Sequence, residues 1–203
     1  DGNGRIVTTG TKGGSVEVLG NRVAVMDNAE IDASGTGDAN AGGGRIMIGG
    51  DFQGKNADIQ NSEITYFGPN ATLKADAGKV GDGGTVIVWA DDTTRAYGSI
   101  SARGGSLSGD GGFVETSGHR SLSITGARVD TRATNGKTGN WLLDPSDIGI
   151  VYGGFAQTFS SPFDPLSNST ITDGDVNTAL GSSSLIIQTS GGTGGSGNIT
   201  VYG

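Results

Sequence analysis

The sequence predicts an all-β chain folded as a parallel β-solenoid, with a short carboxy-terminal extension that contains one helix. The first observation is compositional: glycine supplies 40 of the 203 residues, whereas proline supplies only 4. The glycines follow no Gly-X-Y period, which excludes collagen. The second observation is an internal repeat, a Gly-Gly-x-apolar-x-apolar phrase that returns along the chain and is typical of repeat architectures.

The repeat has two parts. The glycine-containing phrase begins at Gly13, Gly43, Gly83 and Gly111, with a degenerate copy at Gly139, so its intervals are 30, 40, 28 and 28 residues. A second phrase of alternating polar and apolar residues lies between the copies and centres on Ile31, Leu73, Ile100 and Val129. The longest interval predicts an insertion over about residues 51–69.

Each repeat predicts three short strands separated by turn residues. In the best-preserved repeat these are 113–116, 122–124 and 127–131, broken by Ser117-Gly118 and by Gly126. Strands this short bury no core alone, but stacked repeats pair each strand with its counterpart about 4.7–4.9 Å away along the axis. Glycine then serves corners with positive φ or close backbone approach. A β-sandwich is the rival fold, but it predicts no phrase period of this length.

The pattern changes after residue 144. We therefore divide the chain into solenoid coils at 1–144 and a second part at 145–203, which is either further coils or a small subdomain. In the second part we predict a strand at 148–152, a loop over 153–169, and a helix that is capped by Thr172 and ends at Gly181. Two more strands are predicted at 185–189 and 198–202.

Charge and composition exclude several classes of function. The formal net charge is −8 and no cysteine is present, which excludes disulfides, cysteine-ligated zinc, iron–sulfur clusters and thiol catalysis. An acidic chain with scattered Lys and Arg predicts no nucleic-acid binding. No run of 18 apolar residues occurs, so we expect no membrane insertion.

Three stretches resemble segments of large bacterial exoproteins. They are Gly83-Gly84-Thr85-Val86-Ile87-Val88-Trp89-Ala90-Asp91, Gly109-Asp110-Gly111-Gly112-Phe113-Val114-Glu115-Thr116-Ser117-Gly118-His119, and Trp141-Leu142-Leu143-Asp144-Pro145. The family is that of the filamentous-haemagglutinin-like adhesins of two-partner secretion, including the high-molecular-weight type of Haemophilus. The resemblance implies a right-handed parallel β-helix that passes an outer-membrane transporter and is secreted or displayed on the bacterial cell surface.

The function that this resemblance implies is non-enzymatic. We expect a segment of an adhesin, a rigid stalk or filament with binding surfaces for a host cell or matrix receptor, whose weak contacts add by avidity. The region that the transporter recognises is not evident, so we expect it outside this chain. Open terminal strands predict end-to-end self-association. The alternatives are a scaffold segment of a haem-acquisition or contact-dependent toxin exoprotein, and a polysaccharide-cleaving β-helix enzyme.

Two groups of residues are candidates for contacts or modification. Three aromatic residues in the predicted 153–169 loop are candidates for partner binding, namely Phe155, Phe159 and Phe163. Three asparagines stand in Asn-x-Ser/Thr patterns and are candidate glycosylation acceptors, namely Asn70, Asn168 and Asn198.

We expect no catalytic, cofactor or metal site. The single histidine, His119, follows Ser117-Gly118, but adjacency in sequence is not triad geometry, and an exposed turn is the preferred interpretation. A carbohydrate-cleaving site would need aspartates to converge, and the candidates are Asp32, Asp76, Asp91, Asp92, Asp110 and Asp130. Aspartate beside glycine is otherwise turn chemistry. Asp173-Gly174-Asp175 lacks the spacing of a calcium loop.

Overall fold

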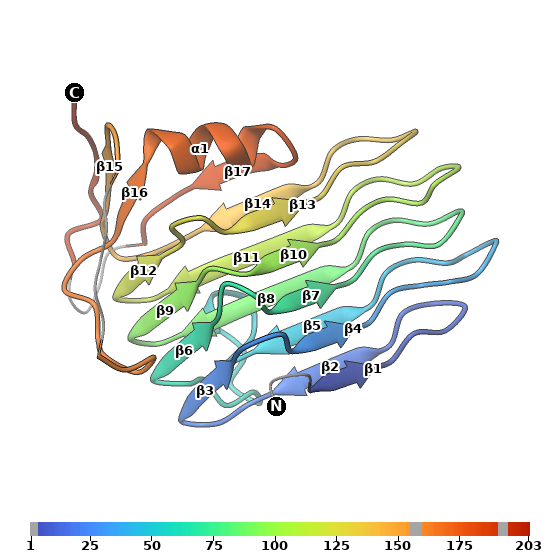
Figure 1. Cartoon of the computed structure of the whole chain (residues 1–203), viewed down its shortest axis with the longest axis horizontal. Helices are drawn as coiled ribbons and strands as arrows, with labels where there is room; N and C mark the ends of the chain where they lie inside the picture. The colour runs from blue at the N-terminus through green and yellow to red at the C-terminus, as the bar shows by residue number, and fades with distance from the viewer. Residues whose placement is uncertain (1–3, 155–159, 191–194) are drawn as a thin grey trace.

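The chain folds into a stack of β-strands in a computed structural model that describes residues 4–154, 160–190 and 195–203 (Figure 1). Three consecutive strands, one in each of three sheets, form a layer that we call a rung. The four complete rungs are β2 (Ser15–Val18), β3 (Arg22–Val25) and β4 (Glu30–Asp32); β5 (Arg45–Ile48), β6 (Ile64–Phe67) and β7 (Thr72–Lys74); β8 (Thr85–Ala90), β9 (Thr93–Ala96) and β10 (Ser99–Ser101); and β11 (Phe113–Gly118), β12 (Ser121–Ser123) and β13 (Arg128–Asp130).

All strand pairs in the three sheets are parallel, and each strand pairs with its counterpart one rung away. The orders are β2-β5-β8-β11-β14-β17 in the six-stranded sheet, β3-β6-β9-β12 in the four-stranded sheet and β1-β4-β7-β10-β13 in the five-stranded sheet. The added strands are β1 (Arg5–Val7), β14 (Asn140–Leu143) and β17 (Ser184–Ile187). The prediction of a mainly β chain with parallel pairing is confirmed, and the stacking is consistent with a solenoid. Its right-handed sense stays a prediction.

The predicted alignment of the repeats is the register of the sheets. Val86 pairs with Ile46 on one side and Val114 on the other, and none of the three is exposed. The second phrase stacks in the same way, with Leu73 beside Ile100 in the five-stranded sheet. Period-2 alternation sends these side chains inward, where they form one continuous core.

The insertion is shorter than predicted. Residues 64–67 form β6, which pairs with β3 and β9 and so belongs to a regular rung. The inserted segment is therefore 49–63, not 51–69. Ile64 and Phe67 lie in the core at 2% and 0% exposure. The apolar spacing of these residues therefore indicates the end of the insertion better than Pro69 does. The segment contains a short 3₁₀ turn, η1 (Phe52–Gly54).

Long loops project from the stack between the five-stranded and six-stranded sheets (Figure 1). These projecting loops are 33–44, 75–84, 102–112 and 131–139, and backbone hydrogen bonds link neighbouring loops, such as Ala41 N to Val80 O and Gly81 N to Ser108 O. The first glycine of each of the four intact phrases packs against the base of the projecting loop of the next rung, where the two arms of that loop meet. A Cβ on Gly111 would lie 1.7 Å from Thr131 O. Close approach, rather than positive φ, is the reason for glycine at this position.

Gly111→Ala is expected to destabilise the fold by about 2 kcal/mol, because the backbone of the next rung at Thr131 and Gly139 must move away to admit the methyl group. Urea unfolding followed by circular dichroism measures the change. Gly20→Ala is the matched control, since the Cβ there meets atoms only at 3.9 Å. Equal midpoints for the two variants would contradict the role assigned to Gly111.

The carboxy-terminal part covers one end of the stack. A three-stranded parallel sheet has the order β16-β15-β18, with β15 (Ile148–Val151), β16 (Thr170–Thr172) and β18 (Ile199–Val201). Helix α1 (Asp173–Leu180) begins at Thr172, whose side chain accepts from Asp175 N in a capping box, and ends at Gly181. Figure 1 shows α1 over the last rung, beside β17. Since β17 extends the six-stranded sheet past residue 144, the domain boundary stays a prediction.

Candidate binding surfaces

The loop that carries Phe163 is tied to the four-stranded sheet. Arg95 of β9 is fully buried; its Nη1 donates to the carbonyl oxygens of Ser161 at 2.9 Å and Pro162 at 3.1 Å, and its Nη2 donates to Asp164 O. A guanidinium presents several donors in a fixed plane, so one side chain satisfies three carbonyls of the loop. Phe163 is half-buried in this anchored segment.

A second arginine holds the same loop farther along. Arg120 Nη1 donates to Leu166 O at 2.8 Å, while Nη2 donates to Asp92 Oδ2 at 2.8 Å. Hydrogen bonds from this guanidinium hold the pKa of Asp92 below its ordinary value, against the opposing effect of burial. Phe155 and Phe159 lie outside the described residues, so partner binding by the three phenylalanines stays a prediction.

The three candidate glycosylation asparagines, Asn70, Asn168 and Asn198, are exposed. Asn70 lies in the turn before β7, Asn168 lies just before β16, and Asn198 precedes β18. The backbone N–H of Asn198 donates to Asp147 Oδ1 at 2.6 Å. Exposure leaves each side chain accessible, and modification at all three stays a prediction.

His119 does not share a hydrogen-bonded triad with its neighbouring serines. The Ser117 hydroxyl accepts from Asp144 N at 3.0 Å, and Ser121 Oγ donates to Leu166 O at 3.3 Å. The imidazole instead lies against Trp89, with ring centroids 6.3 Å apart. His119 is therefore part of a half-buried corner rather than the exposed turn that we expected.

The six aspartates that we considered for carbohydrate cleavage are divided among separate places. Asp76 follows β7 and Asp130 ends β13 of the five-stranded sheet, and they pair with Arg103 and Arg132 respectively. Asp92 pairs with Arg120. The other three accept from different partners: Asp32 from Ser34 N, Asp91 from Trp89 Nε1 and Asn61 Nδ2, and Asp110 from Lys137 N. The structure does not bring these six carboxylates together.

The outer face of the six-stranded sheet carries a site that sequence reasoning missed. Segment 49–63 lies over Met47, Ile87 and Trp89, which form a small apolar cluster outside the main core. Phe52 of η1 contacts Phe113 edge-on, with ring centroids 5.7 Å apart. The signal was available, because Met47 and Ile87 are apolar at positions where the alternation points outward.

Two buried carboxylates lie beside that cluster. Glu115 of β11 is 0% exposed and Asp144 is 2% exposed. Gln53 contacts both, since its backbone N–H donates to Glu115 Oε2 at 3.1 Å and its side-chain amide donates to Asp144 Oδ2. Among the residues that the structure describes, Glu115 Oε1 and Asp144 Oδ1 have no hydrogen-bond partner. Unpaired buried carboxylate oxygens are costly when charged.

Burial raises the pKa of Glu115 to about 7, although hydrogen bonds from the Gln53 backbone N–H and the Ser117 hydroxyl oppose the rise. The negative charges of Asp144 and Asp51 raise it further. Gln53 itself adopts φ 54° and ψ 20°, a left-handed conformation that is rare for non-glycine residues. Because Gln53 covers Glu115, this arrangement anchors segment 49–63 to the sheet.

The described residues contain neither a cluster suited to a metal ion nor a membrane-spanning helix. Within 4–154, 160–190 and 195–203, no group of three or more His, Cys, Asp or Glu side chains is placed to hold a metal ion. In the same residues, no helix is long and apolar enough to cross a membrane.

Comparisons with known proteins are informative for the solved structures. No protein-family model matches the sequence, and no curated protein matches it. Among solved structures, the chain is similar to the crystal structure of the HMW1 secretion domain from Haemophilus influenzae, with 32% sequence identity and a TM-score of 0.55. The match covers 70% of this chain and 35% of that one, so the chain spans about a third of the relative. Over most of its length, this chain is thus similar in sequence and fold to a bacterial secretion domain.

Proposed function

We propose that the chain is a non-enzymatic segment of a secreted or surface-displayed bacterial exoprotein of the two-partner secretion type, and that it belongs to an adhesin. The likeness to the HMW1 secretion domain carries this proposal, because 32% identity extends over 70% of the chain. The stack of parallel rungs supports it, since such a stack is a rigid rod that presents long repetitive faces.

The relative bears on the transporter as well. Sequence reasoning placed the region recognised by an outer-membrane transporter outside this chain, yet the relative is itself a secretion domain. We therefore extend the proposal to these residues: part of the surface that engages the transporter lies within them. End-to-end self-association belongs to the same proposal and would use the β1 end, where every residue of the strand is exposed, because α1 covers the other end.

Saturable binding of the purified chain to epithelial cells and matrix proteins, competed by unlabelled chain, tests the adhesive part. We expect specific binding, and we expect Phe163→Ser to weaken it while Phe52→Ser does not. Phe52 is the matched control, an exposed phenylalanine on a different sheet face. No binding by demonstrably folded protein would make the segment a spacer.

A further inference from the structure

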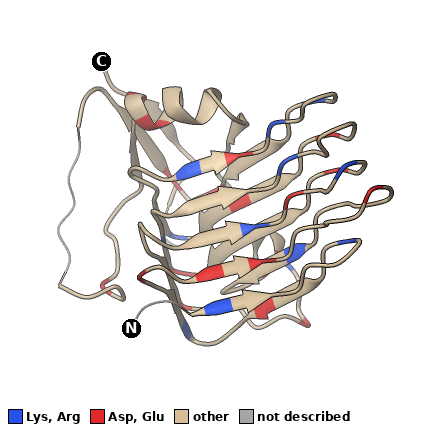
Figure 2. Ribbon diagram, turned by 45° about the vertical axis from the view of Figure 1, so that its right-hand side comes forward, with Lys and Arg blue, Asp and Glu red and all other residues tan. Residues whose placement is uncertain are grey.

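Two adjoining clefts form a groove that runs from the projecting loops onto the five-stranded sheet. The first has a volume of about 420 Å³ and the second about 340 Å³, and both are lined by Arg103 and Arg132. The second cleft also takes in Arg128, with α1 residue Thr178 at its side. Figure 2 shows basic and acidic residues close together on the strands and projecting loops of the stack.

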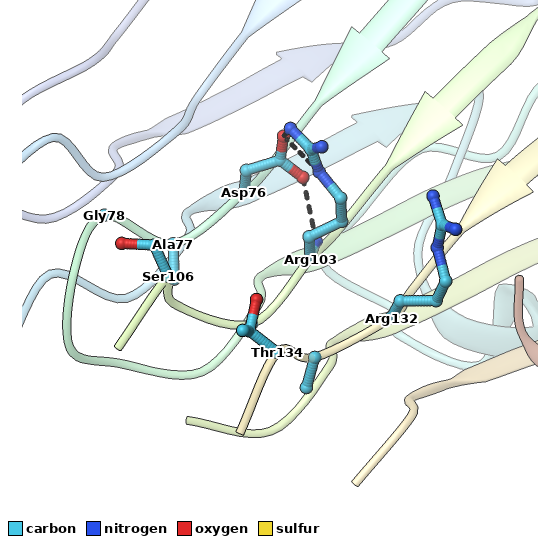
Figure 3. A pocket seen from close by; sticks show the side chains of 9 residues that line it. Asp76, Ala77, Gly78, Arg103, Ser106, Arg132 and Thr134 are labelled. Carbon is cyan, nitrogen blue, oxygen red and sulfur yellow. Dashed lines mark hydrogen bonds and ion pairs between the residues drawn. The ribbon is translucent and has the colours of Figure 1, made fainter. Parts of the chain in front are cut away.

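Two of these arginines are held in place by carboxylates along one edge of the guanidinium. Arg103 donates through Nε and Nη2 to Asp76 Oδ2 at 3.1 and 2.7 Å (Figure 3). Arg132 donates through Nε and Nη2 to the two oxygens of Asp130, at 2.9 and 2.6 Å. In the described part of the chain, neither Nη1 has a hydrogen-bond partner. Each guanidinium is therefore oriented by one edge and keeps donors free on the other.

The groove is a local excess of positive charge on an acidic protein. It contains three arginines and two carboxylates, whereas the whole chain has a net charge of −8. Arg128 is exposed and makes no ion pair with a described residue. Asp76 and Asp130 are already satisfied by arginine, so an incoming anion meets free guanidinium donors first.

The hydroxyl groups of the lining repeat from rung to rung, beside the apolar side chains of Ile100 and Val129. Ser99 stands beside Thr72 and Arg128 in the ladder, and Ser101 stands beside Asp130. Arg103 and Arg132 occupy equivalent positions in adjacent rungs, joined by the hydrogen bond from Gly104 N to Arg132 O at 3.0 Å. Adjacent rungs are about 4.8 Å apart, which is close to the advance of one sugar ring along a linear polysaccharide.

We propose that this groove binds a linear polysaccharide whose sugars carry carboxylates, with Arg103 and Arg132 contacting acidic groups and the serine and threonine hydroxyls contacting sugar hydroxyls. This inference rests on the proposed function and deepens it, since it assigns a ligand class and a face to the adhesive surface. A peptide strand is the less suitable occupant, because the outer edge of β13 is already covered: the Ser182 and Ser183 hydroxyls donate to Val129 O, and Thr131 N donates to Ser182 O.

Isothermal titration of the purified chain with an oligogalacturonate tests the proposal. We expect binding that weakens when NaCl rises from about 20 to about 200 mM, and no binding of the methyl-esterified oligosaccharide, which keeps the sugar chain without its charge. Arg103→Gln and Arg132→Gln should each weaken binding about tenfold, the effect of losing one charge-assisted contact. Arg103→Lys, which keeps the charge and loses the planar fork, should fall between.

Arg22→Gln is the matched control. Arg22 is on the four-stranded sheet, its side chain is 53% exposed against 54% for Arg103, and it too pairs with a carboxylate, Glu63 at 3.5 Å. Unchanged affinity in Arg103→Gln and Arg132→Gln would overturn the proposal. Equal binding of the methyl ester, or of a polyglutamate peptide, would overturn the ligand class.

The same variants separate this proposal from the proposed function. Cell binding that survives in variants without glycan binding would place the adhesive surface elsewhere and refute the groove alone. Glycan binding by a chain that does not bind cells would support the groove and refute the adhesive role of this segment.

Discussion

Val86→Asp is expected to unfold the central rungs and to lower the free energy of unfolding by more than about 4 kcal/mol. Val86 is 0% exposed and lies in register between Ile46 and Val114, which are equally buried. No described basic side chain belongs to this inward column, so the new carboxylate would be buried without a partner. Each rung is stabilised by its neighbours, so the loss extends to the adjacent rungs.

Urea unfolding monitored by circular dichroism, together with hydrogen exchange along β5, β8 and β11, measures this effect. Thr85→Asp is the matched control, since it adds the same charge one residue away, on the outward face and beside Arg45 in the register. We expect the control to stay within about 1 kcal/mol of the wild type. A soluble Val86→Asp protein with a native midpoint would show that this column does not face the core.

Glu115→Gln is expected to remove a pH dependence of stability between about pH 4.5 and 7. The pKa of Glu115 is raised to about 7 in the fold from 4.5, so the folded state holds a proton that the unfolded state releases. The stabilisation is complete below pH 4.5 and is lost as pH rises through 7, a difference of roughly 3 kcal/mol. Glutamine stays neutral at every pH. The free energy of unfolding of Glu115→Gln should therefore rise relative to that of the wild type by about this amount between pH 5 and pH 8.

Stability curves at pH 5 and pH 8 for the wild type and the variant test this expectation. Glu17→Gln is the control, because Glu17 is an exposed glutamate in the same outward column, in register with Met47, Ile87 and Glu115. The pKa values of Asp51, Asp92 and Asp130 are lowered, so their contributions to the free energy of unfolding are lost only at pH values more acidic than this range. Parallel curves for the wild type and Glu115→Gln would contradict the burial of a neutral carboxyl.

The local pattern of this chain determined its rungs. Period-2 alternation within each phrase and the fixed spacing of the phrases gave the register Val16, Ile46, Val86, Val114 and Trp141, which the structure reproduces. The helix after Thr172 was equally accessible, because its cap and its end are set by residues adjacent in sequence. Stacked repeats make long-range contacts periodic, so a one-dimensional pattern is enough to align them.

Only the tertiary structure decided the sites. Gln53 lies 62 residues before Glu115 and 91 residues before Asp144. Segment 49–63 brings them together by folding back across the six-stranded sheet, and this segment contains no copy of the repeat. Arg95 and the carbonyls of 161–164 meet across a similar distance in sequence. These contacts depend on where an irregular segment crosses the sheet, and irregular segments carry no periodicity from which that crossing point is predicted.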